Sequence, residues 1–156
     1  MTRTPPTATL MTRRSALVRT GSALALLLPG IAWGDATKAL EAAMAAVLGE
    51  RQATAGGIKL TTPAIAENGN TVPLQVALDG ALPAGQYVKA IHLFAADNPS
   101  PEVASFFFTP ASGRAQVATR IRLARTQQVI ALAELSDGTV WRAANEVKVT
   151  IGGCGG

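Results

Sequence analysis

The stretch VPLQVAL, residues 72–78, places an apolar side chain at every second position. Residues 117–123 repeat this alternation with Val117, Thr119, Ile121 and Leu123. A period of two is typical of a β-strand that buries one face, because successive side chains point to opposite sides of a sheet. These two stretches therefore predict a chain built mainly from β-strands.

Outward from these stretches, the chain after residue 57 divides into seven runs of strand-forming residues, separated by turn-forming pairs such as Asn68-Gly69 and Asp137-Gly138. The runs are Ile58–Ile65, Val72–Leu78, Tyr87–Ala95, Val103–Thr109, Ala115–Leu123, Gln127–Leu135 and Val140–Ile151. Seven short strands with this spacing predict an antiparallel β-sandwich of the immunoglobulin type.

One helix is predicted before the strands, from Asp35 to about Leu48. It carries a single apolar stripe, formed by Leu40, Ala43, Met44, Val47 and Leu48. Asp35 is a candidate N-cap. Gly56-Gly57 is expected to end the helical region. The helix and the strands together, residues 35–151, are predicted to form one domain of helix plus β-sandwich.

Residues 1–34 have the features of a signal peptide for export through the twin-arginine (Tat) pathway. Arg13-Arg14 forms the twin-arginine pair, although Ala16 stands where the usual motif has Phe. The apolar run that follows is short for a membrane span, and Ala32 and Gly34 suit a cleavage site before Asp35. We therefore predict export to the periplasm, with an uncleaved membrane anchor as the less favoured interpretation.

The basic character of the chain belongs to this signal. The whole chain has 14 basic and 10 acidic residues, and residues 1–34 contain four of the basic residues and none of the acidic ones. The remainder therefore carries ten of each and has no net charge. This balance argues against binding to nucleic acid, which requires net or clustered positive charge, and no membrane association is expected after cleavage.

The last five residues, GGCGG, contain the only cysteine of the chain, Cys154. Glycine offers no side chain to bury and loses much conformational freedom when ordered, so we expect a thin, flexible tail. This flexibility is assigned to Gly152, Gly153, Gly155 and Gly156. An extended tail would carry Cys154 on the order of 10 Å beyond Ile151.

No cationic side chain close in sequence activates the thiol, since Lys148 lies six residues upstream of Cys154. We therefore expect a thiol that reacts inside another protein, and not an enzyme that uses Cys154 as its own nucleophile. A free thiol or an intermolecular disulfide remains an open alternative.

Other candidate residues receive mainly structural interpretations. His92, the only histidine, lies in an apolar strand, and no Cys/His cluster suggests a metal site. Alternation places Phe106 and Phe108 on one face and Phe107 on the other, which either the helix or another protein would cover. The exposed cations Arg120, Arg122 and Arg125 favour a solvated strand face, with docking to acidic partner surfaces as the alternative.

The C-terminal stretch VKVTIGGCGG, residues 147–156, resembles that of the SoxY family of sulfur carriers. Three upstream fragments also resemble this family: Asn98–Glu102, Thr119–Ala124 and Ser136–Gly138. The glycine-flanked terminal cysteine is the specific motif. The resemblance covers roughly the whole exported part and implies the same immunoglobulin-like fold.

The resemblance also implies a function. Cys154 would hold thiosulfate-derived sulfur intermediates covalently, and the chain would have no catalytic residue, metal or cofactor of its own. The implied partners are a SoxZ-like subunit (in a heterodimer or heterotetramer), a haem enzyme, a sulfate-releasing hydrolase and a sulfane dehydrogenase. The alternative is a non-enzymatic periplasmic assembly module that forms an intermolecular disulfide through Cys154.

Overall fold

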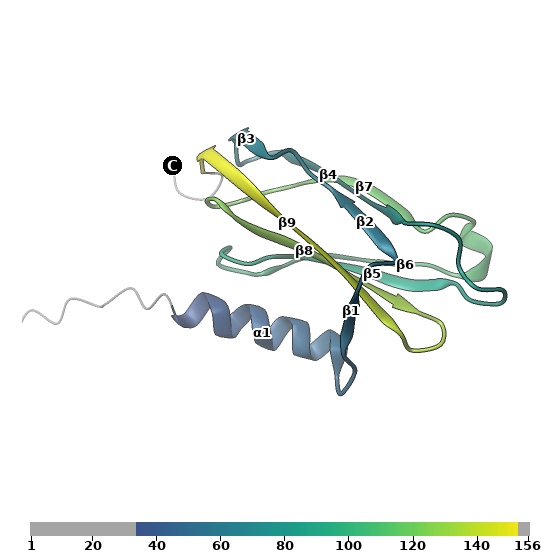
Figure 1. The fold of residues 1–156 in the computed structure, drawn as a ribbon. Helices are drawn as coiled ribbons and strands as arrows, with labels where there is room; N and C mark the ends of the chain where they lie inside the picture. Colours follow the sequence, from purple (N-terminus) through teal and green to yellow (C-terminus); the bar gives the residue numbers. More distant parts are fainter. Residues whose placement is uncertain (1–33, 153–156) are drawn as a thin grey trace, which may run out of the picture. The chain divides into compact units, whose positions relative to one another are not determined.

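The computed structural model of this chain describes residues 34–152, which contain one α-helix, a short 3-10 turn and nine strands (Figure 1). The helix is α1 (Gly34–Leu48), and the turn spans Pro110–Ser112. The strands are β1 (Ala53–Ala55), β2 (Ile58–Thr61), β3 (Ile65–Asn68), β4 (Val72–Leu78), β5 (Val88–Ala95), β6 (Glu102–Phe107), β7 (Gln116–Ile121), β8 (Gln127–Leu135) and β9 (Val140–Ile151).

The strands form two sheets that pack face to face. The larger sheet has the order β1-β9-β8-β5-β6, with β3 also paired to β9, and the smaller sheet has the order β2-β4-β7. The predicted sandwich with an N-terminal helix is therefore confirmed. It is not wholly antiparallel, because β1 and β3 both run parallel to β9. Long stretches of chain separate these strands from β9, and a parallel pair needs such a long connection.

The core lies between the sheets and is made of the inward-facing residues of both. On the smaller sheet these include Val72, Leu74 and Val76 of β4, which confirms the alternation seen in the sequence. The larger sheet contributes Ile91 and Leu93 of β5, both almost fully buried.

Helix α1 covers the outer face of the larger sheet. Its predicted apolar stripe packs onto a second cluster that comprises Phe94, Ile130, Leu132 and Val140. Figure 1 shows the helix on the side of the sandwich opposite to β2, β4 and β7. The helix begins at Gly34, so the predicted N-cap, Asp35, belongs to its first turn. No helix in the described part of the chain is long and apolar enough to cross a membrane.

The predicted run Ile58–Ile65 is wrong as a single strand. It divides into β2 of the smaller sheet and β3 of the larger sheet. Pro63 lies between them and has no N–H to continue a ladder, so the chain changes sheets there. The Asn145 side chain holds the crossing by donating to the Leu60 carbonyl (2.9 Å) and to the Thr62 hydroxyl (3.2 Å).

The segment after α1 also differs from the prediction. The helix ends at Leu48, and Ala53–Ala55 adds a short strand that no sequence pattern indicated. Gly57 follows with φ of 74°, and a Cβ there would lie 2.1 Å from the ring of Trp141. Glycine is therefore required where this connection passes over Trp141.

Candidate functional site: the root of the C-terminal tail

The described residues end one position into the predicted carrier tail. Cys154, Gly153, Gly155 and Gly156 lie outside them, as do the predicted export residues Arg13 and Arg14. The structure therefore describes the point where the predicted tail leaves the domain. We call this place the tail root and define it as Gly69, Ala124, Ile151 and Gly152.

Strand β9 delivers the chain to the tail root and is held along both edges. On one side it pairs with β8, and at its end it pairs with β3, where Asn68 lies opposite Ile151. The Gly69 N–H donates to the Ile151 carbonyl at 2.7 Å, and the Thr150 hydroxyl donates to the Glu67 carbonyl at 2.8 Å. The last residues of β9 are thus fixed to β3 and to the loop between β3 and β4.

Gly152 packs against the loop between β7 and β8. A Cβ at this position would lie 2.3 Å from the carbonyl oxygen of Ala124, which is closer than real Cβ atoms approach. A side chain is therefore excluded at Gly152 unless the backbone moves. Gly152 was assigned to tail flexibility from its sequence, and the structure gives it a packing requirement as well.

A polar brace holds Ala124 in place. The side-chain oxygen of Asn98 accepts from the Ala124 N–H and from the Gln127 side-chain amide, both at 2.9 Å, and the Asn98 amide donates to the Arg122 carbonyl at 2.9 Å. Gln127 is buried and also accepts from the Asp97 N–H at 2.7 Å. The loop before β6 and the loop before β8 are therefore locked together beneath the tail root.

Two of the three fragments that resemble the SoxY family converge on this brace. Asn98–Glu102 contributes the bracing amide, and Thr119–Ala124 contributes the carbonyl that contacts Gly152. Ser136–Gly138 instead forms the turn that precedes β9, about 40 Å from the tail root along a strand of 12 residues. In that turn the Thr139 N–H donates to the Asp137 carboxylate, which lowers the pKa of Asp137.

Sequence reasoning missed both the brace and the cations beside the tail. In the sequence, Asn98-Pro99 indicated only a turn, and Gln127 indicated only the start of a strand. Arg122 and Arg125 flank Ala124 in the chain, and both are exposed. The fold therefore brings positive charge to the tail root, although no cation lies near Cys154 in sequence. Among the described residues, neither arginine forms an ion pair.

Polar backbone and side-chain groups hold the tail root and its neighbouring loops together. Its contacts are made by backbone amides and carbonyls, by the amide side chains of Asn98 and Gln127, and by the hydroxyl of Thr126, which accepts from the Val149 N–H at 3.0 Å. Within residues 34–152, no group of three or more acidic, histidine or cysteine side chains is arranged to hold a metal ion.

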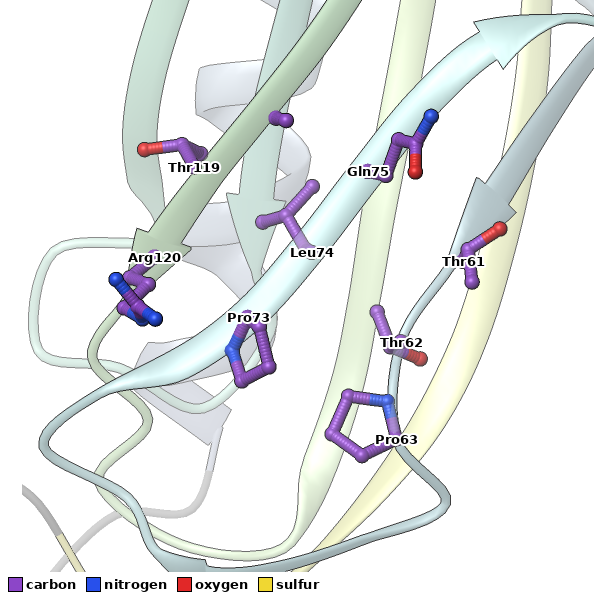
Figure 2. Close-up of a pocket in the computed structure, with 9 residues that line it drawn as sticks. Thr61, Thr62, Pro63, Pro73, Leu74, Gln75, Thr119 and Arg120 are labelled. Carbon is purple, nitrogen blue, oxygen red and sulfur yellow. The ribbon is translucent and has the colours of Figure 1, made fainter.

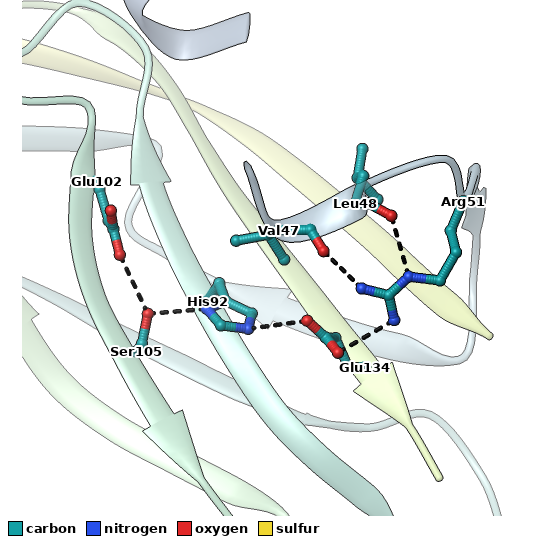
Figure 3. Close-up of polar contacts among 7 residues, drawn as sticks. All are labelled: Val47, Leu48, Arg51, His92, Glu102, Ser105 and Glu134. Atoms are coloured by element: carbon teal, nitrogen blue, oxygen red, sulfur yellow. Dashed lines mark hydrogen bonds and ion pairs between the residues drawn. The ribbon is translucent and has the colours of Figure 1, made fainter. Parts of the chain in front are cut away.

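His92 lies in a separate polar cluster on the outer face of the larger sheet (Figure 3). Its Nδ1 lies 2.8 Å from the Ser105 hydroxyl, and its Nε2 lies 3.4 Å from a carboxylate oxygen of Glu134. Glu134 also accepts a hydrogen bond from the Arg51 guanidinium at 3.1 Å. Arg51 donates further hydrogen bonds to the carbonyls of Val47 and Leu48 at the end of α1. This cluster ties the helix to the sheet, which supports the structural interpretation of His92.

The pKa of Glu134 reflects these neighbours. Burial opposes the ionised form of Glu134, but the hydrogen bond and positive charge of Arg51, together with the charges of His92 and Lys89, outweigh it and lower the pKa. The Glu134 carboxylate is therefore an anchor that is ionised at neutral pH, not a candidate proton donor.

The three consecutive phenylalanines, Phe106, Phe107 and Phe108, follow the predicted alternation. Phe106 and Phe108 pack against the core between the sheets, whereas Phe107 is 78 % exposed on β6. The ring of Phe107 contacts that of His92 edge-on, with centroids 6.1 Å apart. Helix α1 therefore leaves most of Phe107 uncovered.

A groove of about 850 Å³ lies on the smaller sheet (Figure 2). Thr61–Pro63 forms one wall, Pro73–Gln75 crosses the middle, and Thr119 and Arg120 lie at the other side. The predicted placement of Arg120 on the solvent side of its strand is confirmed, since Arg120 is exposed between the buried residues of β7.

Comparisons with known proteins agree with these observations. The family described as "Sulfur oxidation protein SoxY" matches residues 44–154, a range that contains the described domain from the middle of α1 and extends to Cys154. No curated protein sequence matches the chain.

Several solved structures share the fold. A superoxide reductase (neelaredoxin) from Ignicoccus hospitalis is 19 % identical with a TM-score of 0.52, covering 59 % of this chain and 79 % of its own. A point variant of that reductase is also 19 % identical, with a TM-score of 0.53 and with 70 % and 86 % covered. The hypothetical protein PH1083 from Pyrococcus horikoshii is 14 % identical with a TM-score of 0.50, with 62 % and 96 % covered. At such low identity, these matches describe the sandwich alone.

Proposed function

Because the chain belongs to the SoxY family of sulfur oxidation proteins, we propose that it carries thiosulfate-derived sulfur covalently on Cys154 and presents it to partner enzymes. The observation that supports this most directly is the family match, which extends to Cys154 itself. The role is that of a carrier, with bond-making groups supplied by the partners.

The geometry of the tail root suits such a carrier. The tail leaves from the end of a long, doubly paired strand and passes a braced loop at a glycine. A rigid attachment followed by a short, slim tail keeps the thiol close to the domain surface, so a docked enzyme receives it at high effective concentration.

The chemistry assigned to Cys154 is a sequence of balanced steps. A haem enzyme joins thiosulfate to the thiolate through a new S–S bond and removes two electrons, which leaves an anionic S–S–SO₃⁻ group on Cys154. A hydrolase then adds water, releases sulfate and two protons, and leaves a persulfide. A sulfane dehydrogenase can oxidise this remaining sulfur to an attached sulfonate: three water molecules supply the oxygen atoms, six protons are released, and six electrons pass to the electron acceptor of the dehydrogenase.

The setting of this function is also a proposal. Export through the twin-arginine pathway would place the chain in the periplasm, and a SoxZ-like subunit would accompany it in a heterodimer or heterotetramer. Export of a folded pair would account for the twin-arginine pattern predicted at residues 1–34.

The test compares Gly153→Val with Cys154→Ser in the mature protein. Gly153→Val adds a β-branched side chain that widens and stiffens the tail, so we expect loading by the haem enzyme to slow strongly while labelling of Cys154 by a small thiol reagent stays near wild type. Cys154→Ser should abolish loading with the fold intact. If the serine variant is loaded as well as wild type, Cys154 is not the carrier residue.

The alternative function, an assembly module that joins two chains through a Cys154 disulfide, makes a different prediction. Mass spectrometry of the natively exported protein would then find a disulfide dimer alone. Sulfur adducts confined to the C-terminal peptide would instead support the carrier.

A further inference from the structure

The strands of the smaller sheet carry positive charge and no negative charge, and the exposed Asp79 follows β4 only at the end of the sheet away from Arg120. The three strands, β2, β4 and β7, contain Lys59 and Arg120 but no Asp or Glu, and both cations are exposed. Arg122 follows directly after β7 and is also exposed. Within residues 34–152 none of these three cations forms an ion pair. The larger sheet, by contrast, carries both signs of charge: Glu67, Glu102, Glu134 and Glu146 with Lys89, Arg142 and Lys148.

This face is also uncovered and hollowed. Helix α1 packs on the larger sheet, on the other side of the sandwich, so no described helix shields β2, β4 and β7. The groove arises because pairing between β2 and β4 stops at the Thr61–Gln75 pair, after which β2 turns away through Pro63. Pro73 of β4 therefore lies at an opening between the strands, where its missing N–H disrupts no ladder with β2.

The groove combines apolar surface, to which Pro63, Pro73 and Leu74 contribute, with a few polar groups. Thr61 and Gln75 bring a hydroxyl and an amide group to it, and Arg120 lies at one side (Figure 2). None of its lining residues is acidic. An extended segment with carboxylate side chains would find hydrogen-bond donors and a guanidinium there, without a like charge to repel it.

The cationic end of this face adjoins the tail root. Strand β7 ends at Ile121, and the Leu123 N–H donates to the Gly69 carbonyl at 2.8 Å. Ala124, the next residue, contacts Gly152. Arg120 is thus only four residues from the point where the tail leaves the domain. A protein that receives the tail would meet this face at the same time.

We propose that the outer face of the smaller sheet, centred on Arg120 and Arg122, is the docking surface for an acidic surface of the enzyme that receives the Cys154 tail. This inference rests on the proposed carrier function. A second copy of this chain is a poor occupant, because two such faces would oppose cation to cation. Docking here holds the enzyme beside the tail root while the tail enters its active site.

The experiment measures loading of the mature carrier, together with its SoxZ-like subunit, by purified haem enzyme with thiosulfate and an electron acceptor. The variant Arg120→Glu/Arg122→Glu reverses two charges on the proposed surface. The control Lys38→Glu/Lys89→Glu makes the same change in net charge at exposed positions on α1 and β5.

For the test variant we expect KM for the carrier to rise about tenfold while kcat stays within about twofold, because reversed rim charges mainly weaken encounter. Wild-type KM should increase with salt, and the salt dependence should weaken in the test variant. The control should behave like wild type, and thermal melting should confirm that both variants are folded.

An unchanged KM in the test variant, or an equal rise in the control, would overturn the docking proposal while leaving the carrier function intact. Two further outcomes would also overturn it. A changed rate of Cys154 labelling by an anionic disulfide reagent, without enzyme present, would show that the face holds the chain's own tail. Loss of self-association in the variant would show that it joins two copies. Failure of the carrier function is distinct, because Cys154→Ser would then still be loaded.

Discussion

Replacing Gly152 by alanine tests whether the tail root is a packed junction. The added Cβ would lie 2.3 Å from the Ala124 carbonyl oxygen, and Cβ contacts below 3.0 Å are essentially never seen, so a shift of about 0.7 Å is required. An overpacked interior site would lose about 1–3 kcal/mol. At Gly152 the end of the chain can move away from Ala124. The loss in the free energy of unfolding is therefore limited to the contacts that this movement breaks.

The principal contact at risk is the hydrogen bond from the Gly69 N–H to the Ile151 carbonyl. Its loss corresponds to about 1 kcal/mol in the free energy of unfolding, or a decrease in Tm of about 4 °C for a domain of this size. Urea denaturation would measure this difference as a lower midpoint with an unchanged slope. Amide hydrogen exchange at Gly69 should accelerate at the same time.

The matched control is Gly155→Ala, which makes the same chemical change beyond the described residues and should alter stability by less than about 0.5 kcal/mol. Equal stability of the two variants, with unchanged exchange at Gly69, would refute the packed junction. The tail would then leave the domain at the end of β9, without a packed junction at Gly152.

Two further predictions concern Glu134 and the signal. The folded-state pKa of Glu134 is below its ordinary value of 4.5, so its stabilising contribution is present above about pH 4.5 and is lost as the pH falls below that value. Glu134→Gln should therefore lose less stability than wild type between pH 5 and pH 3 in urea titrations, and parallel pH profiles would contradict this. Replacing Arg13 and Arg14 by lysine should retain the precursor in the cytoplasm, which fractionation and immunoblotting measure; normal periplasmic amounts would exclude twin-arginine export.

Much of the fold was predictable because burial leaves a period in the sequence. Strand β4 and the stripe of α1 both separate apolar from polar positions, and both were predicted correctly. Strands β8 and β9 were also predicted with their observed bounds. Strand β1 left no such pattern, since its three residues are Ala-Thr-Ala and none is buried.

The tail root was less predictable, for a different physical reason. Gly152 and Cys154 stood out by composition, but the brace joins Asn98 to Ala124 and Gln127, which are 26 and 29 residues away. The sequence of a loop does not indicate with which distant loop its side-chain amide will form a hydrogen bond. The proximity of Arg122 and Arg125 to the tail root was also not predictable from the sequence, because it depends on how the loop before β6 packs against the loop before β8.

The pairing of β9 has a mechanical consequence. The tail is a direct continuation of a strand of 12 residues that is bonded to β8 on one side and, at its end, to β3 running in the same direction. A pull on the tail along the strand loads these hydrogen bonds in shear. Many of them must then break together, whereas a strand peeled from its end would lose them one by one. We therefore expect the domain to withstand repeated pulling on its C-terminal end without unravelling from that end.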